Sequence, residues 1–350
     1  MTAEQDGRAA SRRPRRATQA GATIDDVAAA AGVSRQTVTR ATNDMAGISA
    51  DTKARVLAAA KELRYRPSRF GRGLARAAHD TLGLVVSDLT NPYYPEFASA
   101  IVRYAGERGW SVVLVDTDPG GEVAAAGPPS HLLASLGRQV DVVVGYLGPR
   151  ATWEDELAGL PVVTVDPPPT EDGDGNGVVR LDPAAALAEA AAHLVAAGAR
   201  TAVALDVSTA DRPTGRAVLV RDALAARGIA TRIDAGAGQG VAAGREAVAR
   251  MTARGDLPDV VVGWNDMVAV GVLSALHAAG VDVPGRVRVL GIDGVPLGAY
   301  VTPALSTLAV DMDEVARHAV ELALSVVRGQ QDPRGGLRTV EHVFVPRASG

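Results

Sequence analysis

Short runs rich in Val, Leu and Ile recur along the chain from residue 81 onward, and longer Ala-rich stretches separate them. Unalternated β-branched runs are typical of parallel strands that are covered on both faces. Regular alternation of such strands with helices predicts a doubly wound α/β fold. The expected strands are residues 82–86, 111–115, 140–144, 161–165, 201–205, 259–263 and 287–292. The expected helices include residues 96–108, 184–197, 215–227, 241–254 and 266–279.

A polar loop, PPPTEDGDGNG at residues 167–177, falls midway through this α/β region. The loop is too rich in Gly, Pro and charge to pack as a strand or helix. We therefore expect two α/β halves, with a ligand cleft between them at the carboxyl ends of their strands. Aromatic residues make up only 3% of the chain, so Ala, Val and Leu must fill the core.

The segment TIDDVAAAAGVSRQTVTRATN, residues 23–43, has the pattern of two short helices joined by a glycine-containing turn. Four apolar residues follow the i, i+3, i+4, i+7 spacing of one helix face: Ile24, Val27, Ala28 and Ala31. Thr23 and Ser34 can cap the two helices, and Gly32 suits the left-handed position that ends the first. The segment therefore predicts a helix-turn-helix.

The second expected helix, residues 34–42, carries side chains suited to reading DNA. Val38 and Ala41 can pack inward, and five polar residues remain: Arg35, Gln36, Thr37, Thr39 and Arg40. Arg and Gln make bidentate contacts to guanine and adenine in the major groove. A third helix follows, with Ser49 as its cap. Its expected apolar face comprises Val56, Leu57, Ala60 and Leu63. The alternative is a three-helix core with an ordinary solvated polar face.

Charge is distributed unevenly along the chain. Residues 1–76 contain 15 Lys and Arg against seven Asp and Glu, a net charge of +8, whereas the remainder has 21 against 33, a net charge of −12. A basic module on an acidic body indicates a nucleic-acid-binding protein. The Arg-rich arm SRRPRR, residues 11–16, either adds phosphate contacts or serves only as a solubilising tail.

Composition excludes several classes of protein. The 350 residues are enough for two or three domains, and the absence of Cys excludes disulfides, a thiolate nucleophile and Cys-based zinc sites. No apolar run approaches transmembrane length, and no apolar signal-peptide core follows the Arg-rich N-terminus. We therefore expect a soluble cytoplasmic protein with no membrane partner.

No pattern of catalytic residues stands out. GAGQG, residues 236–240, lacks the third glycine of GxGxxG, and no apolar strand leads into it. The chain has no Walker loop and no GxSxG, and its six His lack metal-ligand spacings such as HExxH. We expect neither an enzyme nor a cofactor or metal site. Two alternatives stay open: a periplasmic-type small-molecule binding protein, and an α/β enzyme without a gene-regulatory role.

These patterns together resemble the LacI/GalR (lactose-repressor/galactose-repressor) family of bacterial transcription regulators. The resemblance covers nearly everything after residue 22. The motifs that carry it are TIDDVAAAAGVSRQTVTRATN (23–43), ELRYRPSRFGRGLAR (62–76), GLVVSDLTNPYYPEF (83–97), WNDMVAVG (264–271) and LGIDGVPLGAYVTPALSTL (290–308). It implies an all-α helix-turn-helix DNA-binding headpiece. It also implies an α/β effector domain like a periplasmic binding protein, built of two doubly wound subdomains.

The resemblance also implies a division of the chain. The expected parts are a disordered basic arm at 1–22, the helix-turn-helix at 23–66, a hinge helix or linker at 67–80, an N-subdomain at 81–164 and 312–339, and a C-subdomain at 165–311 and 340–350. The chain ends in EHVFVPRASG with no leucine heptad after it, so we expect a dimer rather than a tetramer.

As implied by the resemblance, a homodimer inserts residues 34–42 of each subunit into one half of a palindromic operator. Arg35, Gln36 and Arg40 would read bases. The other expected DNA contacts, mainly to phosphates, are Thr23, Ser34, Thr37, Thr39, Asn43 and Arg69.

The hinge, residues 67–76, would contribute Leu74 as an apolar wedge that unstacks a base step in the minor groove. The alternative for Leu74 is an ordinary linker leucine. Gly71 and Gly73 each cost about 1 kcal/mol relative to Ala in a helix. We therefore expect a hinge that folds only when the dimer binds DNA.

The resemblance further implies a small-molecule effector in the cleft. The expected contacts are Ser87, Asp88, Asn91, Tyr93, Tyr146, Asp166, Arg216, Trp264, Asn265 and Asp293. An Arg fork, an amide and a carboxylate that converge on one cleft suit a polyol such as a sugar. Asp88 and Asn91 have the alternative role of turn residues, and Asp266 that of a helix cap. Thr164 and Gln239 stand where some family members carry aromatics, so the sequence leaves the ligand class open.

The function expected from the sequence is that of a DNA-binding transcriptional regulator, a repressor, whose operator affinity a small-molecule effector modulates. Effector binding would shift the two halves of the body and move the hinge pair. By linkage, the operator must then change effector affinity by the same factor. The sequence leaves open whether the effector induces release or acts as a corepressor.

Overall fold

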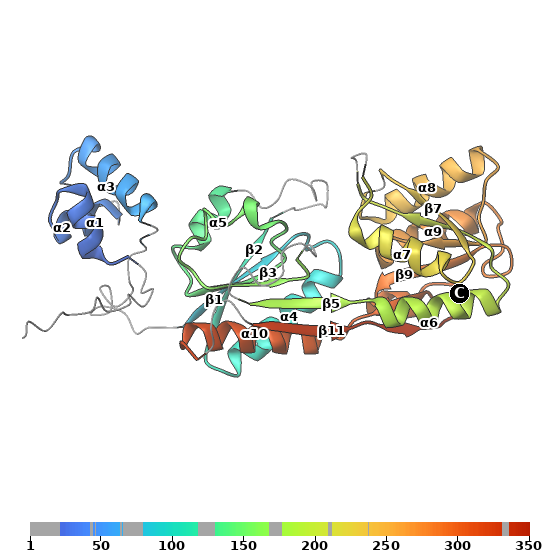
Figure 1. Cartoon of the computed structure of the whole chain (residues 1–350). Coiled ribbons are helices and arrows are strands. Elements are labelled where there is room, and N and C mark those ends of the chain that lie inside the picture. Colours follow the sequence, from blue (N-terminus) through green and yellow to red (C-terminus); the bar gives the residue numbers. More distant parts are fainter. Residues whose placement is uncertain are drawn as a thin grey trace, which may run out of the picture. The chain divides into compact units, whose positions relative to one another are not determined.

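The computed structural model describes residues 22–42, 45, 47–63, 65, 80–117, 130–167, 177–208, 212–236, 238–330 and 336–350 (Figure 1). The chain divides into two compact units, one up to residue 78 and one from residue 79. The expected basic arm up to residue 21, Asn43, and the hinge with Arg69 and Leu74 lie outside the described residues.

The first unit contains the predicted helix-turn-helix. Its helices are α1 (Ile24–Ala31), α2 (Arg35–Thr42) and α3 (Ala50–Glu62). Thr23 caps α1 in a reciprocal capping box with Asp26, and Gly32 ends the helix in the left-handed conformation, with φ 63°. The Ser34 hydroxyl accepts from the backbone N–H of Thr37 at 3.2 Å, and Ser49 caps α3 in the same way. The predicted caps and turn are therefore confirmed.

Small apolar side chains form the core of this unit. The buried residues are Val27, Ala28, Ala31, Val38, Ala41, Val56, Ala59 and Ala60. Leu57 is 43% exposed, so its expected place on the apolar face of the third helix is wrong. Val56, Ala59 and Ala60 follow the i, i+3, i+4 row that faces the core, and Leu57 is turned out of that row by one residue.

The second unit contains two six-stranded sheets. The first sheet has the order β11-β5-β4-β3-β1-β2 and is parallel throughout. Its strands are β1 (Thr81–Val86), β2 (Ser111–Asp116), β3 (Val142–Gly145), β4 (Val162–Val165), β5 (Val178–Asp182) and β11 (Leu337–Glu341).

The second sheet has the order β12-β10-β9-β8-β6-β7, and only β12 runs antiparallel to its neighbour, β10. Its strands are β6 (Thr201–Leu205), β7 (Ala230–Asp234), β8 (Val260–Val262), β9 (Arg288–Asp293), β10 (Ser306–Ala309) and β12 (Val343–Val345). In both sheets the first strand lies between the second and the third. This reversal of strand order is where α/β sheets form ligand crevices.

Helices cover both faces of each sheet. In the first sheet Leu84 packs with α4 (Tyr93–Gly106) and α10 (Met312–Val327), while the next residue, Val85, packs with α5 (Ser130–Leu136). The second sheet packs α6 (Ala184–Ala196) and α7 (Gly215–Ala225) on one face, and α8 (Val241–Ala253) and α9 (Asp266–Ala278) on the other. Two short 3₁₀ helices complete the described elements, η2 (Arg150–Thr152) and η3 (Pro296–Ala299). The predicted doubly wound fold is confirmed.

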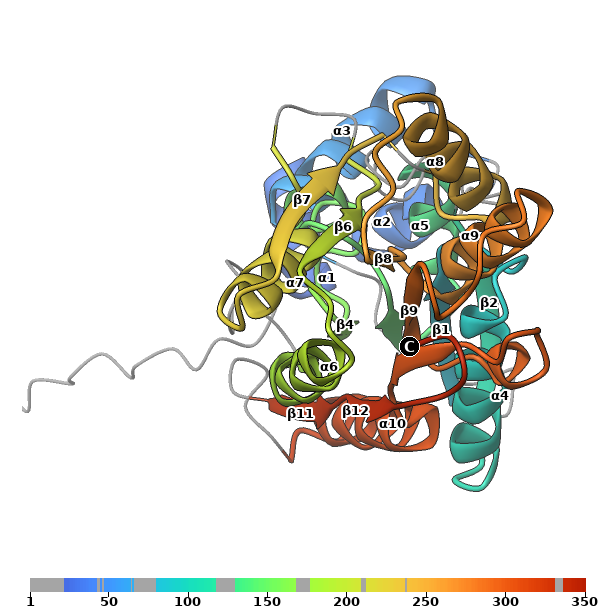
Figure 2. The same cartoon turned by 90° about the vertical axis from the view of Figure 1, so that its right-hand side faces the viewer.

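β5 belongs to the first sheet, where it pairs with β4 and β11. The expected division between residues 164 and 165 had grouped this strand with the C-subdomain. The chain crosses between the sheets three times: after Asp182, between Ala309 and Met312, and at His342 (Figures 1 and 2). The pairing therefore moves the first crossing to the end of β5.

Two glycines allow α8 and α9 to pack at backbone contact. A Cβ atom at Gly271 would lie 2.0 Å from the carbonyl oxygen of Val241, and one at Gly244 would lie 2.0 Å from that of Val268. No side chain fits at these distances, so each position requires glycine.

A buried carboxylate joins α9 to β10 and to the loop after β9. Asp266 is fully buried and accepts from the Thr307 hydroxyl at 2.6 Å and from the Val295 N–H at 2.8 Å. Burial raises the pKa of Asp266 to about 7. Asn265, not Asp266, caps α9, so the alternative of Asp266 as the helix cap is wrong.

Gly271→Ala should destabilise the effector unit by about 1–3 kcal/mol, because the added methyl group forces the backbones of α8 and α9 apart. Gly106→Ala is the matched control at the end of α4, where an added Cβ meets nothing within 4 Å. The control should be neutral or stabilising by about 0.5–1 kcal/mol. Urea unfolding measures both; equal effects would contradict the close helix packing.

Asp266→Asn should flatten the pH dependence of stability. The native state holds a proton on Asp266 up to about pH 7, whereas the unfolded chain loses it near the ordinary value of 3.8. This group therefore stabilises the fold fully below about pH 4, and the contribution is lost as pH rises toward 7. Between pH 5 and 7 wild-type stability should fall by about 1.4 kcal/mol per pH unit relative to the variant. Parallel curves in urea unfolding would refute the elevated pKa.

Candidate functional site

The outer surface of α2 carries the side chains expected to read DNA. Arg35, Gln36 and Thr39 are exposed, and Arg40 is half-buried. The Arg35 guanidinium pairs with the Asp25 carboxylate of α1 at 3.2 Å, and both side chains are about two-thirds exposed. An exposed pair of this kind is weak, so it leaves Arg35 available to an incoming phosphate or base.

The hydroxyl groups of this module have local partners. Ser34 and Thr37 lie 3.0 Å apart at the N-terminus of α2, and Thr39 donates to the carbonyl of Arg35 at 3.1 Å. Thr23 donates its hydroxyl to Asp26 at 2.7 Å. The expected DNA-contacting residues that the structure describes are therefore on α2 or in the caps of α1 and α2.

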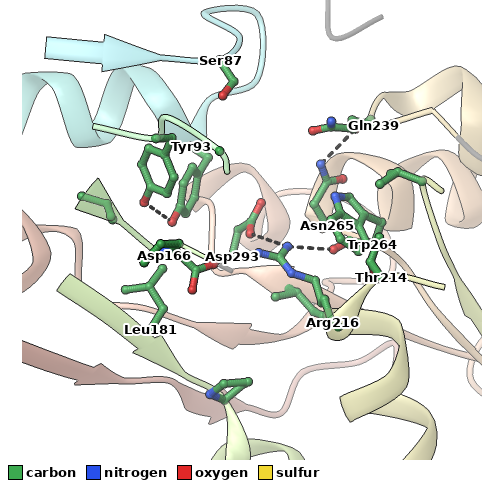
Figure 3. A pocket seen from close by; sticks show the side chains of 18 of the residues that line it. Ser87, Tyr93, Asp166, Leu181, Thr214, Arg216, Gln239, Trp264, Asn265 and Asp293 are labelled. Atoms are coloured by element: carbon green, nitrogen blue, oxygen red, sulfur yellow. Dashed lines mark hydrogen bonds and ion pairs between the residues drawn. The ribbon is translucent and has the colours of Figure 1, made fainter. Parts of the chain in front are cut away.

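The effector unit contains a cavity of about 650 Å³ between the carboxyl ends of its two sheets (Figure 3). Nine of the ten residues expected in the effector cleft line it: Ser87, Asn91, Tyr93, Tyr146, Asp166, Arg216, Trp264, Asn265 and Asp293. Asp88 does not. Its carboxylate accepts from the Thr90 N–H at 2.8 Å and from the Thr90 hydroxyl at 2.6 Å, so the turn alternative describes Asp88.

Arg216, from α7, is the central charged group of the cavity. Its guanidinium lies 3.8 Å from the carboxylate of Asp166 and 3.8 Å from that of Asp293, and it donates to the Trp264 carbonyl at 3.1 Å. The guanidinium also stacks on the Trp264 ring, 4.6 Å from its centre. Asp166 follows β4 of the first sheet and Asp293 ends β9 of the second, so Arg216 links both halves of the cleft (Figure 3).

Burial and mutual attraction determine the charges of this cluster. Burial opposes the charge on Arg216, but the carboxylates of Asp293 and Asp166 outweigh it, and the pKa of the guanidinium is raised. Burial raises the pKa of Asp166 and of Asp293, against the opposing effect of Arg216. The cluster thus combines a fixed cation with carboxyl groups that bind protons more readily than usual.

Both aspartates lie at strained backbone positions. Among the described residues, Asp166 (φ 48°) and Asp293 (φ 120°) are the only ones other than glycine with positive φ. Such conformations cost on the order of 1–3 kcal/mol and concentrate at ligand-binding sites. Strain at the two acids that flank Arg216 indicates that their direction has a functional reason.

Tyrosines form the wall of the cavity on the side of the first sheet. The hydroxyls of Tyr93 and Tyr146 lie 2.6 Å apart, and the ring of Tyr94 meets both rings edge-on. Burial raises the pKa of Tyr94 to about 12, and it raises the pKa of Tyr93 and Tyr146 well above the ordinary value. All three hydroxyls therefore stay neutral, each able to donate and accept.

The second sheet supplies an amide that is already partly engaged. The Asn265 side-chain oxygen caps α9 by accepting from the Val268 N–H at 2.8 Å, and its amide donates to the Gln239 carbonyl at 3.0 Å. Gln239 itself lines the cavity, whereas the buried Thr164 does not. Of the two positions where an aromatic residue was considered, only that of Gln239 therefore lines the cavity.

Several cavity residues had no place among the residues expected in the cleft. The polar ones are Tyr94, Thr117, Arg180, Asp182, Thr214, Gln239 and His342. Thr214 could have been found from its position before an expected helix, because it caps α7. Arg180, Asp182 and His342 gave no signal, since their place in the cavity depends on where the chain crosses between sheets.

Neither a metal cluster nor a membrane span occurs in the part of the chain that the structure describes. No group of three or more His, Cys, Asp or Glu there could hold a metal ion. None of the described helices is both long and apolar enough to cross a bilayer.

Family models match two parts of the chain. Residues 23–68 match the model of bacterial regulatory proteins of the lacI family, and residues 191–349 match a periplasmic binding protein-like domain. The chain is 30% identical over 319 residues to the HTH-type transcriptional regulator AscG of Escherichia coli K12. The matched region covers 88% of this chain and 92% of AscG. It is also 30% identical over 330 residues to the HTH-type transcriptional regulator GalR of Salmonella typhimurium, covering 93% and 94%.

Solved structures agree with these matches. A LacI family transcriptional regulator from Arthrobacter sp. FB24, in complex with lactose, has a TM-score of 0.70 and 34% identity, over 78% of this chain and 99% of that one. The regulator CelR in complex with cellobiose has a TM-score of 0.67, covers 94% of this chain and all of its own, and at 24% identity is similar in fold alone.

The sequence relatives span both units of the chain and nearly all of their own length, and they are regulators of transcription rather than enzymes. The chain described here, with its helix-turn-helix and its two doubly wound α/β subdomains, belongs to the LacI family of DNA-binding transcriptional regulators.

Proposed function

We propose that this regulator is a cytoplasmic repressor that binds a palindromic operator as a homodimer, and that a sugar-like effector in the cleft sets its affinity. The observation that carries the effector part is the Arg216 cluster in a cavity of about 650 Å³. Selection of binding sites from random duplex DNA, with affinity then measured against salt, tests the operator part. An enriched two-fold palindrome with a steep salt slope supports it.

On the DNA side, Arg35, Gln36 and Arg40 read bases and the hydroxyls of α2 hold phosphates. The exposure of Arg35 and Gln36 on a short helix supports this assignment. Asn43, Arg69 and the wedge Leu74 belong to the proposal on the strength of the family resemblance. Base contacts select the sequence, while phosphate contacts fix the register of the helix on the duplex.

On the effector side, a polyol such as a sugar matches the cavity, because each of its hydroxyls can both donate and accept a hydrogen bond. Arg216 offers donors, Asp166 and Asp293 offer acceptors, and the neutral Tyr93 and Tyr146 hydroxyls offer both. A related regulator was solved with lactose, and the same ligand class fits these groups.

A homodimer requires a surface that a second copy can cover. Tyr300 is 83% exposed and Leu297, in the adjoining η3, is 41% exposed. Exposed large apolar residues of this kind are typical of protein interfaces. Two-fold symmetry of the protein then matches the two-fold symmetry of the operator.

The effector acts by changing how the two subdomains are linked. Arg216 belongs to the second subdomain and Asp166 to the first, so a ligand hydroxyl placed between them replaces a contact across the cleft. A change of cleft geometry then alters the hinge and operator affinity, and linkage makes the coupling reciprocal.

We keep the proposed division into arm (1–22), helix-turn-helix (23–66), hinge (67–80) and two subdomains. β5 is reassigned to the N-subdomain on the basis of its strand pairing. The cleft residues after β4 and the crossing after β5 then both belong to the N-subdomain. They lie opposite α7 and β9, which belong to the C-subdomain.

Gln36→Ala should weaken operator binding by about 1–3 kcal/mol and relax sequence preference at one base pair of each half-site. Lys61→Ala, on the exposed last turn of α3, removes a charge away from α2 and is the control. Binding is measured by fluorescence anisotropy on the selected operator and on single-base variants of it. Equal losses on every sequence would show that Gln36 does not read a base.

Arg216→Ala should abolish the effector response, while the variant still binds the operator. Loss of hydrogen bonds to a charged group costs about 1.5–3 kcal/mol, enough to prevent ligand binding at ordinary concentrations. Arg221→Ala, on the same helix with an exposed pair to Asp222, is the matched control. A preserved response in Arg216→Ala, measured with a panel of sugars on the operator complex, would remove Arg216 from the site.

A further inference from the structure

Asp206, directly after β6, is a fully buried residue that does not line the cavity. Its Oδ2 atom accepts from the Thr214 N–H at 2.9 Å and from the Ser208 hydroxyl at 2.7 Å, and its Oδ1 atom accepts from the Thr214 hydroxyl at 2.8 Å. A buried carboxylate is costly unless hydrogen bonds satisfy its oxygens, and both oxygens of Asp206 are satisfied in this way. The polyol site proposed above does not use this residue.

Two of these three hydrogen bonds come from the residue that caps α7. The Thr214 hydroxyl accepts from the Ala217 N–H at 3.3 Å and donates to Asp206 at the same time. In α1 the side chain of Asp26, at the third helical position, accepts from the N–H of the cap residue. α7 has alanine at that position, and Asp206 supplies the missing carboxylate from the end of a neighbouring strand. The start of α7 is thus capped from outside the helix.

Arg216 follows this cap closely, with only Gly215 between it and Thr214. Because glycine leaves the backbone more freedom than other residues do, the helix start gains little rigidity from its own sequence. A carboxylate at the N-terminus of a helix also interacts favourably with the helix dipole. Asp206 therefore fixes the point from which the Arg216 side chain extends into the cavity, where Thr214 lies on the same side (Figure 3).

Backbone hydrogen bonds fix Asp206 and Ser208 to the end of β7. The Asp206 N–H donates to the Asp234 carbonyl at 3.0 Å, and the Gly236 N–H donates to the Ser208 carbonyl at 2.9 Å. The start of α7 and the carboxyl ends of β6 and β7 are therefore connected through Asp206 and its neighbours. Arg216 is thereby attached to the second sheet by hydrogen bonds as well as by the covalent chain.

The contacts of the Arg216 guanidinium depend on where α7 begins. The guanidinium donates to the Trp264 carbonyl at 3.1 Å and stacks 4.6 Å from the centre of the Trp264 ring. It lies 3.8 Å from the carboxylates of Asp166 and Asp293, which is beyond direct hydrogen-bond distance. Binding groups need to be held within about 0.5 Å of their productive geometry by residues that are themselves fixed by packing and hydrogen bonds. A looser start of α7 would move the guanidinium relative to Trp264 and to a ligand alike.

We propose that Asp206 is a positioning residue of the effector site, which aims the Arg216 guanidinium at the ligand without contacting the ligand itself. The inference rests on the proposed role of Arg216 in effector binding. It assigns part of the strength of that binding to a carboxylate outside the cavity. Loss of the Asp206 carboxylate should therefore lower effector affinity and disturb the stacking of Arg216 on Trp264 together.

Asp259 provides a matched control at the opposite end of β6. Its carboxylate accepts from the N–H groups of Arg200 and Thr201 and from the Thr201 hydroxyl, at 2.9–3.0 Å. These are the same kinds of hydrogen bond that Asp206 makes, but they hold the amino end of the strand, away from the cavity. Asp259→Ala should therefore lower stability and leave both the sugar affinity and the surroundings of Trp264 as in wild type.

The first measurement needs no ligand. Fluorescence of the full-length protein, minus that of the same variant with Trp264→Phe, gives the emission of Trp264. Asp206→Ala should shift this emission in the same direction as Arg216→Ala does, and in the Arg216→Ala background it should change nothing further. Asp206→Asn keeps one acceptor oxygen, so it should give a smaller shift, and it serves as the test where Asp206→Ala does not fold.

The second measurement is titration calorimetry with lactose, cellobiose, galactose and glucose. For the sugar that wild type binds most tightly, Asp206→Ala should raise the Kd about tenfold and Asp206→Asn about threefold, with Asp259→Ala within about twofold of wild type. Unchanged Trp264 emission or an unchanged Kd in the Asp206 variants, or equal effects of Asp206→Ala and Asp259→Ala, would overturn the positioning role. If the emission responds as expected but wild type binds none of the sugars, the positioning role stands and the polyol effector is rejected.

Discussion

The cleft of this regulator depends on one half-buried cation, the guanidinium of Arg216. A charge that is partly removed from water needs partners of opposite sign, and the two carboxylates that supply them come from different sheets, Asp166 from the first and Asp293 from the second. The guanidinium also stacks on the indole of Trp264. The two halves of the effector unit are thereby linked through a polar contact that water or a ligand can compete for.

The fold prepares this arrangement before any ligand arrives. In both sheets the strand order reverses next to the first strand, and the side chains of the cavity follow the carboxyl ends of strands on either side of that reversal. Positive φ at Asp166 and Asp293 directs their carboxylates toward Arg216 at a cost in backbone energy. Rigid elements such as the α8–α9 pair, in contact through Gly244 and Gly271, support the second half of the site.

Much of this was predictable from the sequence, because hydrophobic runs, caps and family motifs are local signals. The helix-turn-helix, the seven apolar strands and nine of the ten expected cleft residues are where they were expected. Five strands were not identified: β5, β7, β10, β11 and β12. In β5 and β7 the sequences VVRLD and ATRID carry charges that interrupt the apolar pattern. Asp88 was misplaced because a turn residue and a ligand contact look alike in sequence. His342 could not be found at all, because only the three-dimensional path of β11 into β12 brings residue 342 to the cavity.

That path also constrains how the protein is made. The first sheet is completed by β11, and one of its faces by α10, both of which come from the last 39 residues of the chain. During synthesis, most of the second half therefore leaves the ribosome before the first half is complete. The two halves consequently cannot fold one after the other in chain order, as domains usually do. Until its C-terminal residues emerge, the nascent chain holds an open sheet edge at β5 and an uncovered apolar face. Truncation near the C-terminus would therefore impair the half that was synthesised first.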